Sequence, residues 1–435
     1  MKTLLIRAED KNVWERRAPL VPKDLKEVVK KTGVKAYLQK SEKRVFPEDD
    51  YVSAGAQVCD DMNPGEVILG IKEIPEEKLL DHKVYVFFSH TIKGQKENMP
   101  MLKKIIQGGS TLIDYERVAD SQGNRRIFFG NYAGHAGTLN ILHLMGEYWK
   151  HHGVTTPFSL GRRAMDYGSV KEAQRHMVEI GRAIERHGLN DKLSPLVIGI
   201  LGYGNVAKGV QEMLRCLPVR FIAPEKLPGF YEKGGVDSNK VYVSVFREEH
   251  LVRHRKNRPF DLQDYYQHPE NYKADLERYL PFLSILINAI YWDSRYPRLV
   301  TWESLRRLYE GPDAPKLCGI ADITCDVGGS IECNVKTTNS GMPAYLCNPM
   351  DRSITDGHKG EGVVLLAIDN LPAEIPNDSS RFFSNQLKAF IGNLVNADYD
   401  KSLEKSGLDP EMQRAVIVYK GELTSPYRNL ERDIS

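Results

Sequence analysis

The sequence predicts an α/β protein with two Rossmann-like domains, each built on a parallel sheet, and a cleft between them. Three observations lead to this expectation. A chain of 435 residues exceeds the size at which one hydrophobic core usually stops growing. Short apolar runs alternate with helical patterns along most of the chain, as in parallel sheets. Residues 195–209 indicate a buried strand, a glycine turn and the start of a helix.

That segment, PLVIGILGYGNVAKG, carries the first functional signal. Gly202 permits a tight bend, Gly204 lets the backbone approach a diphosphate, and Ala207 allows the new helix to pack on its strand. The first N–H groups of the helix would face the anion. A dinucleotide site is therefore favoured, although glycine turns also occur in purely structural corners. The predicted cofactor-binding residues of this turn are Gly202, Gly204, Asn205, Val206 and Ala207.

Composition narrows the classes of function. The formal net charge is +2, so no nucleic-acid partner or anionic membrane surface is expected. No apolar run approaches the ~20 residues of a membrane helix. The N-terminal MKTLLIRAED fits neither a secretory nor a transit signal, which predicts a cytoplasmic protein. Six cysteines without a CxxC pair favour reduced thiols, and no metal site is expected.

Ionisable residues end three successive predicted strands. VILGIK ends at Lys72, VYVFFSH at His90 and TLIDYE at Glu116. Each alone is most simply a strand-end residue in solvent, but the carboxyl ends of parallel strands share one edge, where ligands bind. Three such groups on one edge favour acid–base chemistry, because close titratable groups shift one another's pKa values.

Arg17 lies in WERRAPLVP, between the first strand and the first helix. An arginine there is commonly solvated. It also precedes an apolar stretch, so it could point inward and hold a carboxylate with its planar guanidinium.

Two helices are expected along the chain between the strands of the first domain and the strand that precedes the glycine turn. Apolar residues at helical spacing predict a long amphipathic helix that starts after Gly130 and ends near Gly153. A second helix should begin at Ser169, with Glu172 completing a capping box, and stop at Gly188.

Beyond the glycine turn, residues 219–223 predict the second strand of this domain. A dinucleotide site usually has an acid there for the ribose hydroxyls, and Glu225 lies 23 residues after Gly202. Arg220 and Lys226 flank it, so the residues alone leave NAD and NADP both open.

Asp322 and Asp326 fall at or just past the end of a further strand, in KLCGIADITCD, before a Gly-Gly turn. An aspartate in this place is usually a turn former. The functional alternative puts a carboxylate beside the nicotinamide or a substrate amine.

Several segments occur together in one order, and they are LIRAEDKNVWERRAPLVP, GIKEIPE, VFFSHTIKGQ, LIDYE, FFGNYAGHAG, LGYGNVAKG, INAIYWD, IADITCDVGGSIE and AIDNLPAEIP. With them the chain resembles, over nearly its whole length, the lysine-ketoglutarate reductase (saccharopine-forming) half of animal and plant aminoadipic semialdehyde synthases. It is more distantly similar to fungal lysine-forming saccharopine dehydrogenase, alanine dehydrogenase and the proton-pumping transhydrogenases.

The resemblance implies a discontinuous substrate domain, residues 1–133 and 335–435, and a dinucleotide-binding domain, residues 134–334. It also implies an NAD(P)-dependent oxidoreductase of lysine degradation that condenses lysine with 2-oxoglutarate and reduces the imine to saccharopine. NADPH is the expected cofactor, with NADH as the alternative. The site residues that the resemblance implies are Lys72 and His90 as the acid–base pair, Arg17 for a substrate carboxylate, Glu116 and Arg126 as further cleft residues, Asp322 and Asp326 in a loop near substrate or cofactor, and Glu225 at the ribose.

The sequence ends at Ser435, without the second dehydrogenase half of the bifunctional enzymes. We therefore expect a separate saccharopine dehydrogenase to act next, and a homo-oligomer is compatible with the sequence. Two other functions stay open. One is an amino-acid dehydrogenase of the alanine dehydrogenase type, which uses free ammonia. The other is a dinucleotide-binding sensor without turnover, although such a module needs only the glycine turn and fold alone does not decide function.

Overall fold

The computed structural model describes residues 1–232, 236–311 and 315–434, which form two compact units. Unit 1 contains Met1–Phe129 and the chain from Pro376 onward, and unit 2 contains Gly130–Ile375. Each unit holds one large sheet rich in parallel strands, so the predicted α/β class is confirmed.

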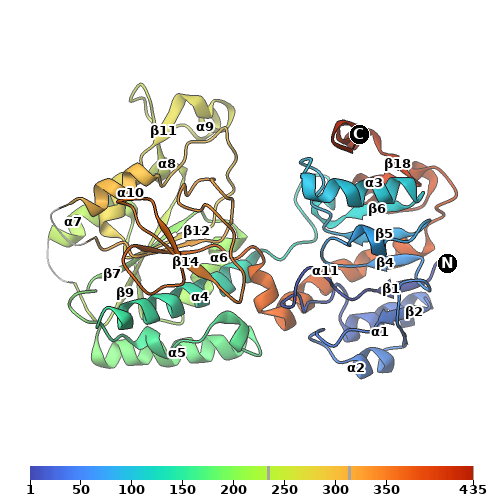
Figure 1. Ribbon diagram of the computed structural model, residues 1–435, viewed down its shortest axis with the longest axis horizontal. Helices are drawn as coiled ribbons and strands as arrows, with labels where there is room; N and C mark the ends of the chain where they lie inside the picture. Colours follow the sequence, from blue (N-terminus) through green and yellow to red (C-terminus); the bar gives the residue numbers. More distant parts are fainter. Residues whose placement is uncertain (233–235, 312–314, 435) are drawn as a thin grey trace. The chain divides into compact units, whose positions relative to one another are not determined.

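The sheet of unit 1 has the strand order β18-β17-β6-β5-β4-β1-β2-β3 (Figure 1). The strands from β6 to β3 run parallel, and β17 and β18 add an antiparallel edge. These strands are fully apolar where both faces are covered, as in the LLI of β1. Their bounds are β1 Leu4–Ile6, β2 Ala36–Gln39, β3 Ala56–Cys59, β4 Val67–Leu69, β5 Val84–Phe87, β6 Thr111–Asp114, β17 Val416–Tyr419 and β18 Glu422–Leu423.

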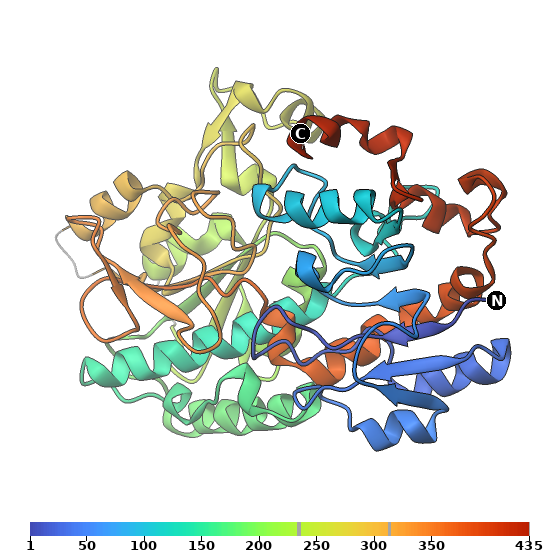
Figure 2. The same cartoon turned by 45° about the vertical axis from the view of Figure 1, so that its right-hand side comes forward.

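The α-helices of unit 1 come from both ends of the chain. In Figures 1 and 2 the long C-terminal helix α11 lies against α1. Ser384 on α11 donates to the buried Asp24 of α1 at 2.6 Å, and Lys388 Nζ lies 2.9 Å from the same carboxylate. The helices are α1 Pro22–Thr32, α2 Glu48–Ser53, α3 Met99–Gln107, α11 Pro376–Asn396, α12 Pro410–Arg414 and α13 Glu431–Ile434.

The sheet of unit 2 has the order β15-β14-β16-β13-β12-β7-β9-β8. Strand β14 is antiparallel to both its neighbours, the other pairs are parallel, and β10 and β11 form a separate hairpin. The strands are β7 Leu196–Leu201, β8 Val219–Phe221, β9 Val241–Phe246, β10 Val252–His254, β11 Tyr272–Ala274, β12 Ile285–Asn288, β13 Gly319–Asp322, β14 Ala344–Cys347, β15 Ile354–Asp356 and β16 Val363–Leu366.

The structure differs from the expected division of the chain at the second domain boundary, residue 335. The prediction placed residues 335–375 with the first domain. Strands β14, β15 and β16 of that segment instead extend the sheet of unit 2, with β16 pairing directly with β13. Local periodicity shows that a strand is present, but it does not show which sheet the strand joins.

The α-helices of unit 2 are α4 Gly130–His151, α5 Val170–His187, α6 Asn205–Leu214, α7 Leu227–Glu232, α8 Glu248–Leu251, α9 Leu262–Gln267 and α10 Trp302–Tyr309. The start of α5 confirms the predicted cap, since the side chain of Ser169 accepts from the N–H of Glu172 at 3.2 Å. The carboxylate of Glu172 accepts from the N–H of Gly168 rather than from that of Ser169. The helix stops at Gly188, which has φ +72°.

Helix α4 is present where it is expected, but it is not an ordinary amphipathic helix. Its residues are buried on nearly all sides from Gly134 to Trp149. A Cβ on Gly134 would lie 2.1 Å from the carbonyl oxygen of Val206, and one on Gly209 would lie 2.2 Å from that of Asn131. Glycine at these two positions therefore allows α4 and α6 to cross in backbone contact.

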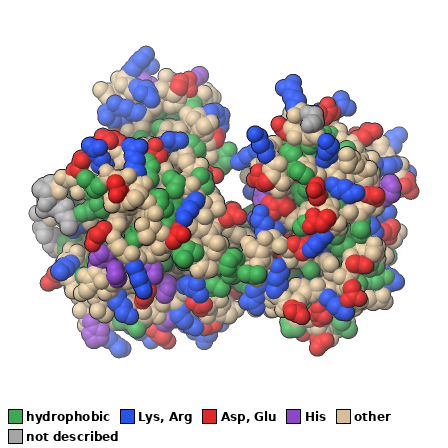
Figure 3. Space-filling model, in the orientation of Figure 1, with side chains coloured by type: hydrophobic (Ala, Val, Ile, Leu, Met, Phe, Trp, Pro, Cys, Tyr) green, Lys and Arg blue, Asp and Glu red, His purple; other side chains and the backbone are tan. Residues whose placement is uncertain are grey.

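The surface agrees with the near-zero net charge. Figure 3 shows acidic and basic side chains interspersed on the face drawn, without a field of one sign. Within the described residues, no helix is both long and apolar enough to cross a membrane.

Candidate functional site

Strands β4, β5 and β6 are neighbours in the sheet of unit 1 and run parallel, so their carboxyl ends share one edge. Lys72 follows β4, His90 follows β5 and Glu116 follows β6. The structure thus places the three predicted residues beyond adjacent strand ends. Their chemical roles stay predictions.

Glu73 is the residue that sequence reasoning missed at this edge. Its Oε1 is hydrogen-bonded to Nδ1 of His90, and its side chain is only 11% exposed. Burial alone would raise the pKa of Glu73, but the hydrogen bond and charge of His90, helped by Lys72 and Lys11, outweigh burial and lower it to about 2. The carboxylate therefore stays ionised and orients the imidazole. Its position next to Lys72 in GIKEIPE was a usable signal.

His90 is held in an uncommon backbone conformation, with φ +47°. The buried Asp114 at the end of β6 accepts from the N–H of Ser89 at 3.0 Å and from the N–H of Glu116 at 2.7 Å. Burial raises the pKa of Asp114. One carboxyl group thus ties together the loops that carry His90 and Glu116.

The turn that carries Lys72 has a similar support. Glu9, three residues after β1, accepts from the N–H groups of Ile71 at 2.7 Å and Lys72 at 3.0 Å. Arg7 lies 3.4 Å from the same carboxylate. The side chain of Lys72 is itself mostly covered, since the residue is only 9% exposed.

Arg17 points inward, as the sequence suggests, but its guanidinium already holds a carboxylate. Its Nε and Nη2 donate to Glu15 at 2.8 and 2.5 Å, and both side chains are almost fully buried. The guanidinium carbon also lies 4.2 Å from the ring centroid of Phe129. A substrate carboxylate at Arg17 would have to share this guanidinium with Glu15, so that role stays a prediction.

Arg126 is less favourably placed for the expected role. It is exposed and pairs with Glu411 of α12 at 3.4 Å. The neighbouring residue Arg125 forms an isolated bridge with Ala119. This arrangement assigns Arg126 to a surface contact between two segments of unit 1.

The glycine turn of unit 2 follows β7 and starts α6. Gly202 has φ +94°, and a Cβ there would lie 2.8 Å from Cγ2 of Ile290. Gly204 is the N-cap of α6, and a Cβ there would meet nothing within 4 Å. Ala207 is buried, while Asn205 is exposed and Val206 is half-buried. The first N–H groups of the helix thus border open space, which fits the approach of a diphosphate.

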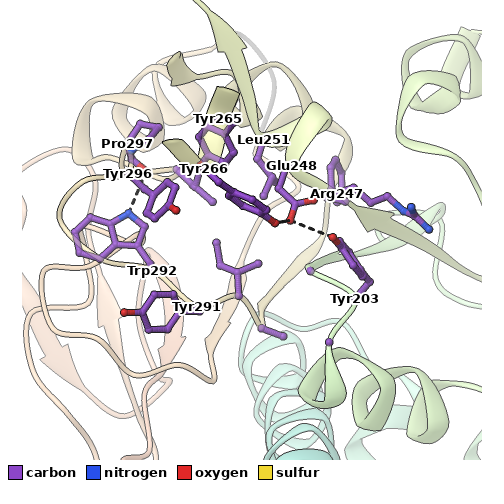
Figure 4. A pocket seen from close by; sticks show the side chains of 16 residues that line it. Tyr203, Arg247, Glu248, Leu251, Tyr265, Tyr266, Tyr291, Trp292, Tyr296 and Pro297 are labelled. Carbon is purple, nitrogen blue, oxygen red and sulfur yellow. Dashed lines mark hydrogen bonds between the residues drawn. The ribbon is translucent and has the colours of Figure 1, made fainter. Parts of the chain in front are cut away.

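Beside this turn lies a pocket of about 370 Å³ (Figure 4). The pocket is formed at the carboxyl ends of β7, β9 and β12, with α9 as a further wall. Its walls are largely aromatic, which suits the flat base of a nucleotide. The polar or aromatic side chains that line it are Tyr203, Phe246, Arg247, Glu248, Tyr265, Tyr266, Tyr291, Trp292 and Tyr296.

Glu225 does not line this pocket within the described part of the chain. Its carboxylate accepts a hydrogen bond from Nε2 of His250 at 2.8 Å. The hydrogen bond to His250 lowers the pKa of Glu225. One oxygen of its carboxylate is thus already bonded to His250, and contact of Glu225 with the ribose stays a prediction.

Asp322 is only 1% exposed at the end of β13. Its carboxylate accepts from Asn288, Thr324 and Asn334, each at 2.8 Å. Burial raises the pKa of this group. Asp322 therefore holds loops together, whereas Asp326 is exposed, and a role of either residue toward substrate or cofactor stays a prediction.

Comparison with known proteins agrees with this architecture. The alanine dehydrogenase/PNT N-terminal domain matches residues 5–136, and the alanine dehydrogenase/PNT C-terminal domain matches residues 252–426. The chain belongs to the alanine dehydrogenase/PNT family. The N-terminal match of this family falls mostly on unit 1, while the C-terminal match begins in unit 2 and continues into unit 1.

Among family relatives, alpha-aminoadipic semialdehyde synthase of Arabidopsis thaliana is 38% identical over 98% of the chain. The chain spans 41% of the length of that relative. Saccharopine dehydrogenase [NAD(+), L-lysine-forming] of Emericella nidulans is 24% identical, with 90% of the chain and 92% of the relative covered.

A solved L-alanine dehydrogenase has a TM-score of 0.62 to this structure at 17% identity, covering all of both chains. This likeness shows the two-domain α/β fold. The relatives are oxidoreductases by name, and the chain has the sequence and fold of that class of enzyme.

Proposed function

We propose that this chain is a lysine-2-oxoglutarate reductase, which condenses L-lysine with 2-oxoglutarate and reduces the imine to saccharopine. The sequence likeness to aminoadipic semialdehyde synthase covers nearly the whole chain, and the shorter relative is named as a lysine-forming saccharopine dehydrogenase. Unit 1 is then the substrate domain, and unit 2 the dinucleotide-binding domain.

The observation that carries this proposal is the Lys72, Glu73 and His90 group beyond β4 and β5. Imine formation requires a neutral amine, proton delivery to a carbinolamine and loss of water, so two proton-transfer groups are needed beside the carbonyl. Lys72 and His90 supply these groups, and Glu73 orients His90. A reduced nicotinamide supplies the hydride when it is bound.

NADPH is the proposed cofactor. Arg220 and Lys226, which flank Glu225 in the sequence, do not line the pocket within the described chain. Arg247 lines it instead and supplies the cation. Parallel titrations of the protein with NADPH and NADH test this preference, and tighter binding of NADH would contradict it.

Gly204 provides a direct test of the cofactor site. We expect Gly204→Ala to weaken NADPH binding about tenfold or more, because the new Cβ enters the space beside the first turn of α6. Folding should be unchanged, since that Cβ meets no protein atom within 4 Å. The matched control is Gly229→Ala on α7, where a Cβ is equally unopposed. Equal NADPH affinity in both variants would contradict a diphosphate at this turn.

The substrate requirement tests the whole proposal. We expect oxidation of NADPH to require lysine and 2-oxoglutarate together, because only the condensed adduct brings binding energy from both substrates to the reacting carbon. The absorbance of the reduced nicotinamide is followed with each substrate alone, with both, and with ammonia plus pyruvate or 2-oxoglutarate.

The outcomes separate the other functions. Oxidation with ammonia at least as fast as with lysine would indicate an amino-acid dehydrogenase, and cofactor binding without oxidation under any condition would indicate a sensor. If saccharopine is the product, an activity that oxidises saccharopine is the expected next step. The oligomeric state stays a prediction.

A further inference from the structure

We propose that Arg247 and Glu248 recognise the adenosine ribose of the cofactor, and that Glu225 acts only as a positioning residue through His250. This inference rests on the proposed function, since it assumes that a dinucleotide occupies the pocket beside the glycine turn. Arg247 and Glu248 would then determine whether the site prefers a ribose diol or a 2′-phosphate.

The order of strands in the sheet of unit 2 supports this assignment. In the usual dinucleotide fold the second strand in sequence lies beside the first, and its terminal acid meets the ribose. Here β9 lies between β7 and β8, so the third strand of the domain takes that place. The N–H of Gly202 donates to the carbonyl of Phe246 at 3.0 Å, which puts the end of β9 directly beside the glycine turn.

The lengths of β8 and β9 also favour the residues that follow β9. β9 pairs with β7 along its whole length, from Val241 to Phe246. β8 ends with Phe221, which is opposite Val243. At a rise of about 3.3 Å per residue, β8 therefore stops roughly 10 Å before the edge where the glycine turn begins. The residues that follow β9 reach the pocket, whereas those that follow β8 do not line it within the described chain.

Glu248 is already oriented toward the pocket. The hydroxyls of Tyr203 and Tyr266 both donate to its Oε1, at 3.2 and 2.8 Å (Figure 4). Burial, followed by the hydrogen bond to Glu248, raises the pKa of Tyr266, so this phenol stays a donor at neutral pH. Because both bonds end on Oε1, the other carboxylate oxygen can accept a ribose hydroxyl.

Arg247 also contacts Tyr203. Its guanidinium carbon lies 5.1 Å from the centroid of that ring, and the side chain is exposed. Tyr203 belongs to the glycine turn itself, so the contact holds the cation next to the turn. A planar guanidinium can bind two phosphate oxygens at once, which favours a 2′-phosphate over a diol.

His250 connects Glu225 to this pair. Its Nδ1 accepts from the backbone N–H of Arg247 at 3.0 Å, and its Nε2 therefore carries the proton that bonds to Glu225. His250 is buried, whereas the side chain of Glu225 is 63% exposed. Glu225 thus fixes the turn from which Arg247 and Glu248 project.

The test measures binding of NADPH, NADH and 2′,5′-ADP to the purified protein by calorimetric titration. Arg247→Gln should weaken NADPH and 2′,5′-ADP about 10–100-fold and leave NADH almost unchanged, the scale of one lost hydrogen-bonded charge pair. Arg247→Lys should keep part of this binding. Glu248→Gln should weaken NADH more than NADPH. Glu225→Ala should weaken both dinucleotides by a similar factor.

Arg220→Gln is the matched control, because Arg220 is an exposed arginine on β8 and should change none of the affinities. A selective loss of NADPH in Arg220→Gln or Glu225→Ala, or an equal loss of both dinucleotides in Arg247→Gln, would overturn this inference while leaving the proposed function intact. Failure of the wild-type protein to bind either dinucleotide would overturn both. Thermal unfolding of each variant establishes that it is folded.

Discussion

Lys72→Met and His90→Gln should each lower turnover with lysine and 2-oxoglutarate about 10²–10⁴-fold, the usual cost of removing a general acid or base. The affinity for NADPH should stay almost unchanged, because both residues belong to unit 1 and the glycine turn belongs to unit 2. Steady-state rates and cofactor titrations measure the two effects separately.

The chain offers controls of the same residue types. His82 is an exposed histidine of unit 1 and also has a positive φ, +56°, so His82→Gln repeats the chemical change at the opposite end of β5 from His90. Lys78→Met does the same for a lysine that pairs with Asp10 at 3.0 Å. Wild-type turnover in Lys72→Met and His90→Gln would remove both residues from the mechanism.

Glu73→Gln should lower turnover about 10–100-fold, the scale known for removal of carboxylates that orient metal-bound histidines. The pKa of Glu73 is lowered to about 2, so the carboxylate is ionised throughout the working pH range. Its loss removes the negative charge that contacts Nδ1 of His90. The pH profile of turnover should therefore shift in Glu73→Gln, because a charge beside the proton-transfer pair is lost.

A purely structural role for Glu73 predicts a different result, in which stability falls and the pH profile keeps its position. Glu77→Gln is the control, since Glu77 is exposed a few residues further along the same loop. Pairs of rate profiles over pH, recorded for the wild type and both variants, distinguish the two roles.

Local patterns were sufficient to predict the strand ends of unit 1. Each of the segments that end at Lys72, His90 and Glu116 is an apolar run followed by a polar group, and parallel strands bring such ends to one edge. The pairing of Glu73 with His90 was not predictable in the same way. It joins loops that follow two different strands and depends on the uncommon backbone conformation of His90.

In unit 2, the distance between residues along the chain does not determine which strands are neighbours. Glu225 has the expected distance from Gly202 along the chain, yet β9 rather than β8 lies beside β7. Strand order is set by packing of the whole sheet and leaves no mark on the spacing of one motif. The burial of Asp322 is also not evident from its local sequence, because two of its hydrogen-bond partners, Asn288 and Asn334, lie 34 and 12 residues away along the chain.

The interruption of unit 1 by unit 2 has a consequence for synthesis on the ribosome. Strand β6 borders β17, and the core of unit 1 includes Phe383, Leu387 and Val418 from the C-terminal segment. Until that segment emerges, the nascent N-terminal part keeps an unpaired strand edge and exposed apolar side chains, which favour aggregation. Unit 2 is continuous in sequence and can complete its core earlier. Chaperone dependence during translation is therefore expected to be concentrated on residues 1–129.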